Sequence, residues 1–307
     1  MATDKPTMLA GTSGEVLLLG LTPPRASVSA AEAAQIASVT LARLDGLDLD
    51  GLVLYDIDDE SDRNPDQRPF PYLPTMDPGV FQSDYLAGWE RPVVVYRCVG
   101  KYPRDELSGW LREIDTDRVF SVFVGSSSAD KAVHTRMDEA HALREQVRPE
   151  LPLGGVSITE RYSARGDEHL RMLRKQERGC SFFISQVVYN VDATKSLISD
   201  YFYECAERGV PPRRMIFTLS VCGSPKTLEF LKWLGVDVPR WLQNSLTRSP
   251  DPLTDSYRQC LANARELIGF CRNLGMPFGF NVESVSIRKV EIDASVLLAK
   301  EIRTLLH

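Results

Sequence analysis

The pattern that most constrains this chain is a short apolar run followed by a helical stretch, which recurs eight times along its 307 residues. Runs of this length, rich in branched and aromatic side chains and bounded by turn residues, are typical of buried strands. We expect strands at residues 16–19, 51–55, 93–96, 119–124, 153–158, 182–188, 215–219 and 278–282. The matching helices are expected at 29–44, 78–88, 104–114, 131–147, 167–178, 193–208, 226–234 and 292–306.

Two architectures place strands and helices in this alternating order. A doubly wound open sheet usually carries Gly-x-Gly-x-x-Gly between its first strand and first helix, and this chain has no such motif there. We therefore predict an α/β fold, a single (β/α)₈ TIM barrel over residues 1–307 with a flexible N-terminus at 1–13. A helical insertion at 239–274, with a long helix from about Asp255, is expected between the seventh and eighth units. The functional site should lie at the carboxyl ends of the strands.

Composition excludes several classes of function. The net charge is −6 and the Lys and Arg residues form no cluster, so we expect no nucleic-acid partner. No apolar run approaches the ~20 residues of a membrane span, and the N-terminus lacks the order of a signal peptide. We therefore expect a cytoplasmic protein without a membrane partner, and a homo-oligomer is left open. The six cysteines are scattered, which predicts reduced thiols and no metal site.

One polar residue interrupts the sixth predicted strand. Gln186 places an amide inside an apolar run, and a buried amide needs a hydrogen-bond partner. That partner is either neighbouring backbone or a ligand at the end of the strand. From the residues alone, both interpretations stand.

Other strand ends offer candidates for anion binding. Ser126 and Ser127 precede a helix expected near Ala129, where hydroxyl and N–H groups could hold a pyrophosphate, although plain helix capping explains the serines equally. Arg63 and Arg161 are placed to clamp a phosphate or carboxylate, or to form surface salt bridges. We name these four as candidate cofactor-binding residues.

The residues at 179–197 and 217–241 resemble the methylenetetrahydrofolate reductase family. Gly-Cys-Ser-Phe-Phe-Ile-Ser-Gln-Val-Val-Tyr-Asn, which begins at Gly179, is similar to that family's Gly-Ala-x-x-x-Ile-Thr-Gln-Phe-Phe-Phe-Asp strand. Gly235-Val-Asp-Val-Pro-Arg-Trp is similar to its Val-x-Ile-Pro-x-Trp segment. Shorter matches are Pro23-Pro24-Arg25, Asp62-Arg63 and Cys98.

This resemblance implies a TIM barrel that reduces 5,10-methylenetetrahydrofolate to 5-methyltetrahydrofolate. In the family the hydride passes from NAD(P)H through FAD bound at the strand ends. Carried over by position, Gln186 would contact the folate, and we add Tyr189, Asn190 and Tyr55 as further folate-binding candidates.

The chain departs from the family where the family's acids lie. Gly20 stands where the resemblance places a proton-donating Glu, and Val124-Gly125-Ser126 replaces an Arg-Gly-Asp. A general acid typically raises a reaction rate by ~10²–10⁴-fold, so we expect another residue to have taken over the proton-donating role. The catalytic candidates are Asp56, Glu160 and Glu283.

Three functions therefore stay open for this chain. The first is an atypical reductase with a tetrahydrofolate substrate, FAD and NAD(P)H. The second is a flavin-independent, folate-dependent one-carbon transferase. The third is a barrel that binds folate or flavin without catalysis.

Overall fold

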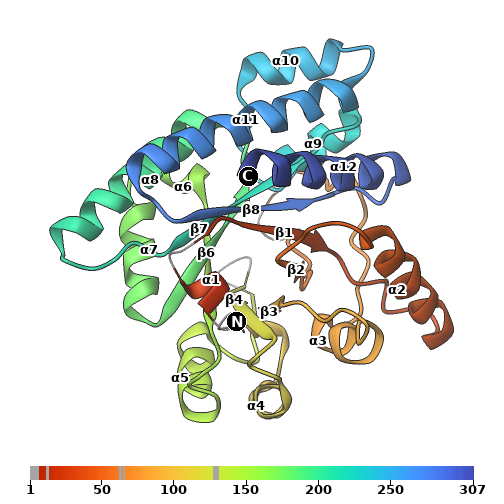
Figure 1. Cartoon of the computed structure of the whole chain (residues 1–307). Coiled ribbons are helices and arrows are strands. Elements are labelled where there is room, and N and C mark those ends of the chain that lie inside the picture. Colours follow the sequence, from red (N-terminus) through yellow and green to blue (C-terminus); the bar gives the residue numbers. More distant parts are fainter. Residues whose placement is uncertain (1–6, 12–13, 62–63, 65, 127–130) are drawn as a thin grey trace. The chain divides into compact units, whose positions relative to one another are not determined.

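The computed structural model of this chain describes residues 7–11, 14–61, 64, 66–126 and 131–307. Its strands are parallel and follow chain order around a closed barrel, β1-β2-β3-β4-β5-β6-β7-β8. Figure 1 shows the chain coloured along its sequence, with most of these strands labelled. The predicted (β/α)₈ barrel is confirmed. The strands are β1 (Val16–Leu21), β2 (Gly51–Leu54), β3 (Val93–Cys98), β4 (Val119–Val124), β5 (Leu153–Ser157), β6 (Cys180–Val187), β7 (Arg214–Ser220) and β8 (Phe278–Glu283).

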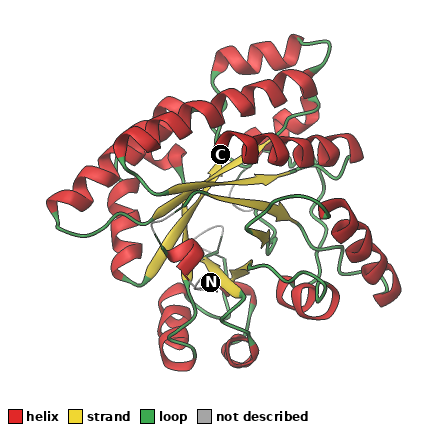
Figure 2. Ribbon diagram, in the orientation of Figure 1, coloured by secondary structure: helices red, strands yellow, loops and turns green. Residues whose placement is uncertain are grey.

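Helices follow the strands along the chain (Figure 2). They are α1 (Thr7–Ala10), α2 (Ala30–Leu44), α3 (Pro78–Val80), α4 (Arg104–Glu113), α5 (Met137–Val147), α6 (Thr159–Arg165), α7 (Glu168–Glu177), α8 (Val191–Glu207), α9 (Pro225–Trp233), α10 (Arg240–Arg248), α11 (Pro252–Leu274) and α12 (Lys289–Leu306). A π-helix (Phe81–Tyr85) continues α3, and a 3₁₀ turn (Val99–Lys101) follows β3. The predicted insertion is confirmed as α10 and α11.

The chain divides into two compact units. The first holds residues 20–46 and 50–154, with β2, β3 and β4 and the helices α2 to α5. The second holds residues 8–19, 47–49 and 155–307, with β6, β7 and β8 and the helices α6 to α12. In the second unit β6 pairs with β7, β7 with β8, and β8 with the first part of β1. Adjacent parallel strands bring their carboxyl ends to one edge of each unit.

The helix predicted near Ala129 begins later, at Met137. The preceding residues bond to the turn after β3 instead of to one another: His134 N–H donates to Gly100 O at 2.9 Å, and the Thr135 hydroxyl donates to Tyr102 O at 2.7 Å. Ser127 and residues 128–130, on which the expected pyrophosphate site depends, lie outside the described residues. Ser126 is exposed and lies well before the helix.

The predicted flexible N-terminus is corrected for the part that the structure describes. Arg214 is fully buried at the start of β7, and its guanidinium donates to Gly11 O at 2.8 Å and to Gly14 O at 2.6 Å. Leu9 of α1 is also fully buried. A buried cation needs such acceptors, so the carbonyl groups before β1 are held in place.

A buried cation in the first unit orders the start of α3. Arg97 of β3 lies between the rings of Trp110 and Tyr102, at 4.2 and 4.7 Å from their centroids, and forms an ion pair with Asp77. Asp77 caps α3 by accepting from the N–H groups of Gly79 and Val80. The ion pair between Arg97 and Asp77 therefore links β3 and its two neighbouring aromatic rings to the start of α3.

This pair predicts a pH dependence of stability. Burial alone would raise the pKa of Asp77, but the Arg97 guanidinium and the N–H groups lower it overall. The pKa of Asp77 is therefore below its unfolded value of about 3.9, so its contribution is complete above that pH and is lost as the pH falls further. We expect Asp77→Asn to flatten the acid limb of the unfolding curve, measured by circular dichroism. An unchanged acid limb would contradict this prediction.

Candidate functional site

Gln186 lies in a bulge at the carboxyl end of β6. Between its pairs at Ile184 and Val187, β6 has two residues where β7 has one. The half-buried Gln186 donates from Nε2 to Leu234 O at 3.5 Å, and its Oε1 accepts from the Val187 N–H at 3.1 Å. A distance of 3.5 Å is the long limit for a hydrogen bond, so this amide can exchange its contact for a better partner.

The segment 234–238, which joins α9 to α10, is bonded to this end of β6. Asn190, the N-cap of α8, donates from Nδ2 to the Asp237 carboxylate at 2.7 Å. The Asp237 N–H donates in turn to Oε1 of Glu160, at the start of α6, at 3.0 Å. We call Glu160, Gln186, Asn190 and Asp237 the β6 cluster; all four are half-buried.

Glu160 is the member of the β6 cluster suited to proton transfer. Burial raises the pKa of its carboxyl group, and the hydrogen bond from the Asp237 N–H offsets this only in part. Its Oε2 is buried and has no hydrogen-bond partner among the described residues. A carboxyl group that keeps its proton to a higher pH than an ordinary carboxyl is a candidate general acid.

Polar side chains also occupy the ends of β7 and β8. Ser220 pairs with Glu283, and two residues earlier on each strand Thr218 pairs with Asn281. Side chains at paired positions point to the same side of a sheet, so Glu283 shares its side with Asn281 and Thr218. Asn281 donates to the Thr218 hydroxyl at 3.3 Å. The half-buried Glu283 carboxylate stays a catalytic prediction.

Two other predicted residues of the second unit lie elsewhere. Tyr189 is 2% exposed, and its hydroxyl donates to Ser220 O at 2.6 Å. The structure thus places Tyr189 in the core, because its side chain packs inward after the bulge, and this does not fit the predicted folate contact. Arg161 is exposed on α6.

Asp56 is a buried carboxylate at the carboxyl end of β2. It accepts from the Cys98 N–H at 2.7 Å, from the Tyr102 hydroxyl at 2.8 Å and from Lys101 Nζ at 2.5 Å. Burial alone would lower the pKa of Lys101, but the Asp56 charge and hydrogen bond raise it overall. Because three donors engage the carboxylate, it is placed to position Lys101.

The other predicted residues of the first unit fall into two groups. The ring of the half-buried Tyr55 packs against Tyr96, with centroids 4.9 Å apart at an angle of 60°. Arg63 and Ser127 lie outside the described residues.

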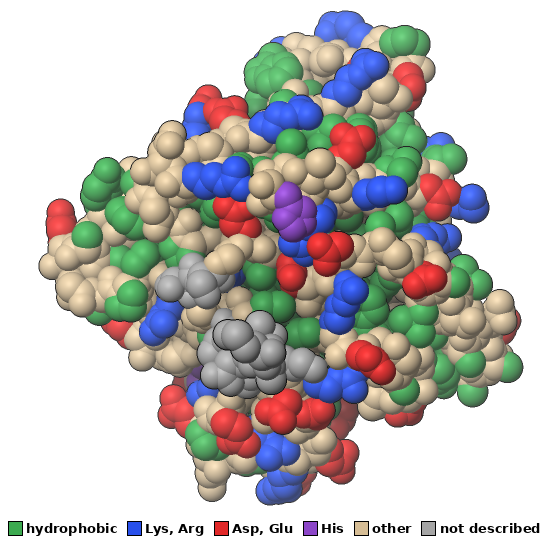
Figure 3. All heavy atoms as spheres, viewed as in Figure 1, with side chains coloured by type: hydrophobic (Ala, Val, Ile, Leu, Met, Phe, Trp, Pro, Cys, Tyr) green, Lys and Arg blue, Asp and Glu red, His purple; other side chains and the backbone are tan. Residues whose placement is uncertain are grey.

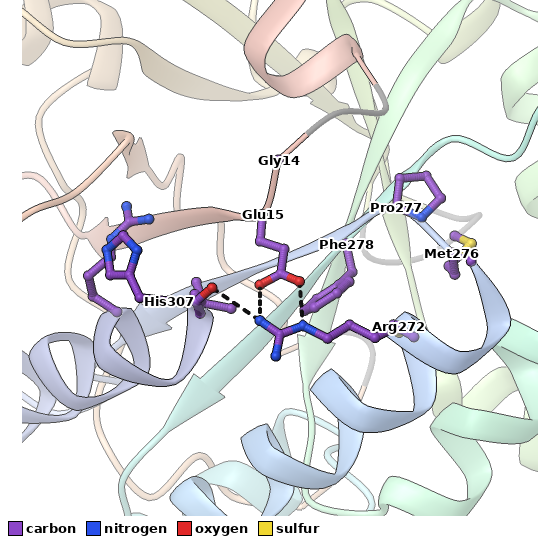
Figure 4. A pocket seen from close by; sticks show the side chains of 11 residues that line it. Gly14, Glu15, Arg272, Met276, Pro277, Phe278 and His307 are labelled. Carbon is purple, nitrogen blue, oxygen red and sulfur yellow. Dashed lines mark hydrogen bonds and ion pairs between the residues drawn. The ribbon is translucent and has the colours of Figure 1, made fainter.

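A cavity of about 520 Å³ lies at the other ends of the strands, where β1 and β8 begin. Figure 4 shows Arg272 and Glu15 facing each other across it, with two hydrogen bonds of 2.7 and 2.8 Å. Figure 3 shows basic and acidic side chains interspersed on the face seen from this side. Because Arg272 is already paired and the cavity lies away from the carboxyl ends, we do not assign it to the candidate site.

The described residues add three further findings. No group of three or more His, Cys, Asp or Glu among them is arranged to hold a metal ion. All six cysteines are buried free thiols. None of the described helices is long and apolar enough to cross a membrane.

Two residues of these networks were not among the sequence candidates. Asp237 lies within the Gly235-Val-Asp-Val-Pro-Arg-Trp segment, so the motif was a usable signal for it. Lys101 follows the third strand, but nothing in its neighbours indicates that it pairs with Asp56, 45 positions earlier.

Comparison with known proteins finds a close relative among the solved structures. No protein-family model matches the chain, and no curated protein matches it. A solved structure of an uncharacterized protein from Clostridium thermocellum, which binds two copies of 5-methyl-5,6,7,8-tetrahydrofolic acid, is 41% identical over 97% of this chain and 98% of its own, with a TM-score of 0.85.

More distant structures share the fold alone. A Baeyer-Villiger monooxygenase component from Pseudomonas putida is 10% identical, covering 93% of this chain and 97% of its own (TM-score 0.51). A GH10 endoxylanase from a sugarcane soil metagenome is 8% identical, covering 94% and 97% (TM-score 0.53). At such identities only the barrel is shared. The chain belongs to the family of the Clostridium thermocellum protein that binds 5-methyl-5,6,7,8-tetrahydrofolic acid.

Proposed function

We propose that this protein binds reduced folates, with 5-methyltetrahydrofolate as its ligand and two copies per chain. The observation that carries the proposal is the relative of 41% identity, which binds two copies of that molecule. The resemblance of residues 179–197 to methylenetetrahydrofolate reductases supports it independently.

The β6 cluster is our proposed site for the first copy. A pterin ring presents N–H donors beside a carbonyl acceptor, and the amide of Gln186 both donates and accepts. Its present partners are a 3.5 Å contact to Leu234 O and the adjacent N–H. Exchanging these for a well-aligned ligand is favourable, because neither is a strong hydrogen bond.

Replacement of Gln186 tests this site. We expect Gln186→Ala to weaken 5-methyltetrahydrofolate binding by about 1–3 kcal/mol, or about 5- to 150-fold, because the buried pterin edge loses its partner. Isothermal titration calorimetry measures the affinity, and Gln35→Ala on the exposed face of α2 is the matched control. Equal affinities of the folded Gln186 variant and the control would refute the assignment.

A second candidate function, one-carbon chemistry on the bound folate, is favoured by Glu160. The acid would give its proton to the folate nitrogen whose bond to the one-carbon unit breaks, and that nitrogen keeps the bonding electron pair. A buried carboxyl with a raised pKa and a buried Oε2 without a partner among the described residues suits this role. Both a reductase resembling methylenetetrahydrofolate reductase and a methyl transferase need such a proton.

The two reactions differ in their need for a flavin: the reductase reaction uses one, and the transferase reaction does not. Most of the predicted cradle for the FAD pyrophosphate, Ser127 and residues 128–130, lies outside the described residues, while Ser126 is exposed and α5 begins only at Met137. We therefore assign no step to FAD. The visible spectrum of the purified protein separates the reactions: flavin bands support the reductase, and a colourless protein supports the transferase or binding alone.

A further inference from the structure

We propose that Ser185 and Thr218 are positioning residues for the folate contact of Gln186, because their side chains hold the β6 bulge in which Gln186 lies. The inference rests on the proposed function and deepens it, since it assigns the placement of that contact to two buried side chains. All three residues belong to the second unit.

The bulge interrupts the regular pairing of β6 with β7. Ser185 and Gln186 of β6 stand opposite the single residue Phe217 of β7. Pairing resumes where Val187 meets Thr218. A bulge of this kind leaves backbone groups without their ladder partners, and buried N–H and C=O groups need partners. The groups that supply those partners therefore maintain the bulge, and with it the position of Gln186.

Two side-chain hydrogen bonds between the strands supply these partners. The Thr218 N–H donates to the Ser185 hydroxyl oxygen at 2.9 Å, and the Thr218 hydroxyl donates to Ser185 O at 2.8 Å. Each side chain thus satisfies a backbone group of the other residue, and we call this pair the Ser185–Thr218 clasp. The Thr218 hydroxyl oxygen also accepts from Asn281 Nδ2 at 3.3 Å, which connects the clasp to β8.

Burial separates the role of the clasp from that of Gln186. Ser185 and Thr218 are only 5% and 2% exposed, whereas Gln186 is half-buried. The clasp offers almost no surface to a ligand, so it would act on binding through Gln186, which directly follows Ser185. Its two hydrogen bonds are also shorter than the 3.5 Å contact of Gln186 with Leu234 O. A firmly held backbone that carries an exchangeable amide reduces the ordering that binding would otherwise cost.

Folate titration of hydroxyl variants tests the clasp. We would measure 5-methyltetrahydrofolate binding to the full chain by isothermal titration calorimetry. Thr218→Val keeps nearly the same shape but leaves Ser185 O without this donor, and Ser185→Ala removes the acceptor of the Thr218 N–H. We expect each to weaken the equivalent that Gln186 binds by about fivefold or more, a usual coupling within one hydrogen-bond network. Thr218→Ser keeps the hydroxyl and should bind as tightly as the wild-type protein.

A double-mutant cycle separates positioning from a general loss of stability. If the clasp acts through Gln186, Thr218→Val should cause no further loss of affinity in the Gln186→Ala protein. Ser185→Ala provides the same cycle if Thr218→Val does not fold. The matched control is Thr135→Val, because Thr135 is also 2% exposed and its hydroxyl donates to Tyr102 O at 2.7 Å. This control lies in the first unit and should leave the affinity of that equivalent unchanged.

The outcomes distinguish the clasp from the proposed function. A crystal structure of ligand-free Thr218→Val tests the clasp without folate, and it should show altered pairing of β6 with β7 around Gln186. An unchanged bulge would overturn this inference while folate binding stands. Losses that multiply in the double variant, or an equal loss in Thr135→Val, would overturn it as well. No binding by the wild-type chain would overturn the proposed function and this inference together.

Discussion

Asp56→Ala is expected to lower the free energy of unfolding by about 3–5 kcal/mol, the usual cost of removing one partner from a buried ion pair. The carboxylate is fully buried and accepts from three donors, Lys101 Nζ, the Tyr102 hydroxyl and the Cys98 N–H. Its removal leaves the buried hydroxyl and N–H without an acceptor and a half-buried ammonium without its counter-charge.

Denaturant unfolding of the variant measures this loss. The matched control is Asp58→Ala in the same loop, because Asp58 also pairs with a lysine, Lys131, at 2.7 Å, but its side chain is 21% exposed. We expect the control to lose only about 0–1 kcal/mol, since solvent screens its ion pair. Equal losses in the two variants would show that burial does not distinguish Asp56.

These two aspartates show a limit of prediction from sequence. The run from Asp56 to Asp62 contains five acidic residues, and local pattern alone cannot tell which of them is buried. Asp56 is distinguished by donors that come from the last residue of β3 and from the turn after it, 42 to 46 positions later. Only the pairing of β2 with β3 brings those donors to it.

The strands were more predictable than the helices. Each strand contains a mostly apolar run, and all eight were expected within a few residues because both faces of a parallel barrel strand are buried. Helix α6 was missed, since its seven residues are mostly polar and short. Its one usable signal was Gly166, which ends the helix with φ of 70°. Helix α5 was expected too early, because bonds to Gly100 and Tyr102 hold the preceding residues.

The candidate site was predictable only where a local sequence pattern marks a residue. Gln186 was found because an amide inside an apolar run is a local anomaly. The bulge at Gln186 depends on the register of β6 with β7, which the sequence does not reveal. The contacts of Asp237 with Glu160 and Asn190 join residues 77 and 47 positions apart, so no local pattern indicates them. Tyr189 is buried, with its hydroxyl bonded to Ser220 O, and the sequence did not indicate this because a bulge changes which side the following residues face.

Glu160→Gln is expected to lower the rate of one-carbon chemistry by about 10²–10⁴-fold, the usual worth of a general acid. The amide keeps the shape of the side chain and can still accept from the Asp237 N–H, so folate affinity should change little. Steady-state assays with 5,10-methylenetetrahydrofolate and NADH or NADPH, with and without FAD, measure the reductase reaction. Loss of methyl from 5-methyltetrahydrofolate, with a thiol as acceptor, measures the transferase reaction.

The pH profile distinguishes an acid from a structural residue. Burial raises the pKa of Glu160, so the protonated, active form persists to higher pH than for an ordinary carboxyl and is lost as the pH rises through that pKa. The wild-type rate should therefore fall on the alkaline side of this pKa, and the residual rate of Glu160→Gln should lack that limb. Glu283→Gln, at the end of β8, is the matched comparison. If Glu283→Gln removes the limb and Glu160→Gln retains it, the proton donor is Glu283, and our assignment of the acid to the β6 cluster is wrong.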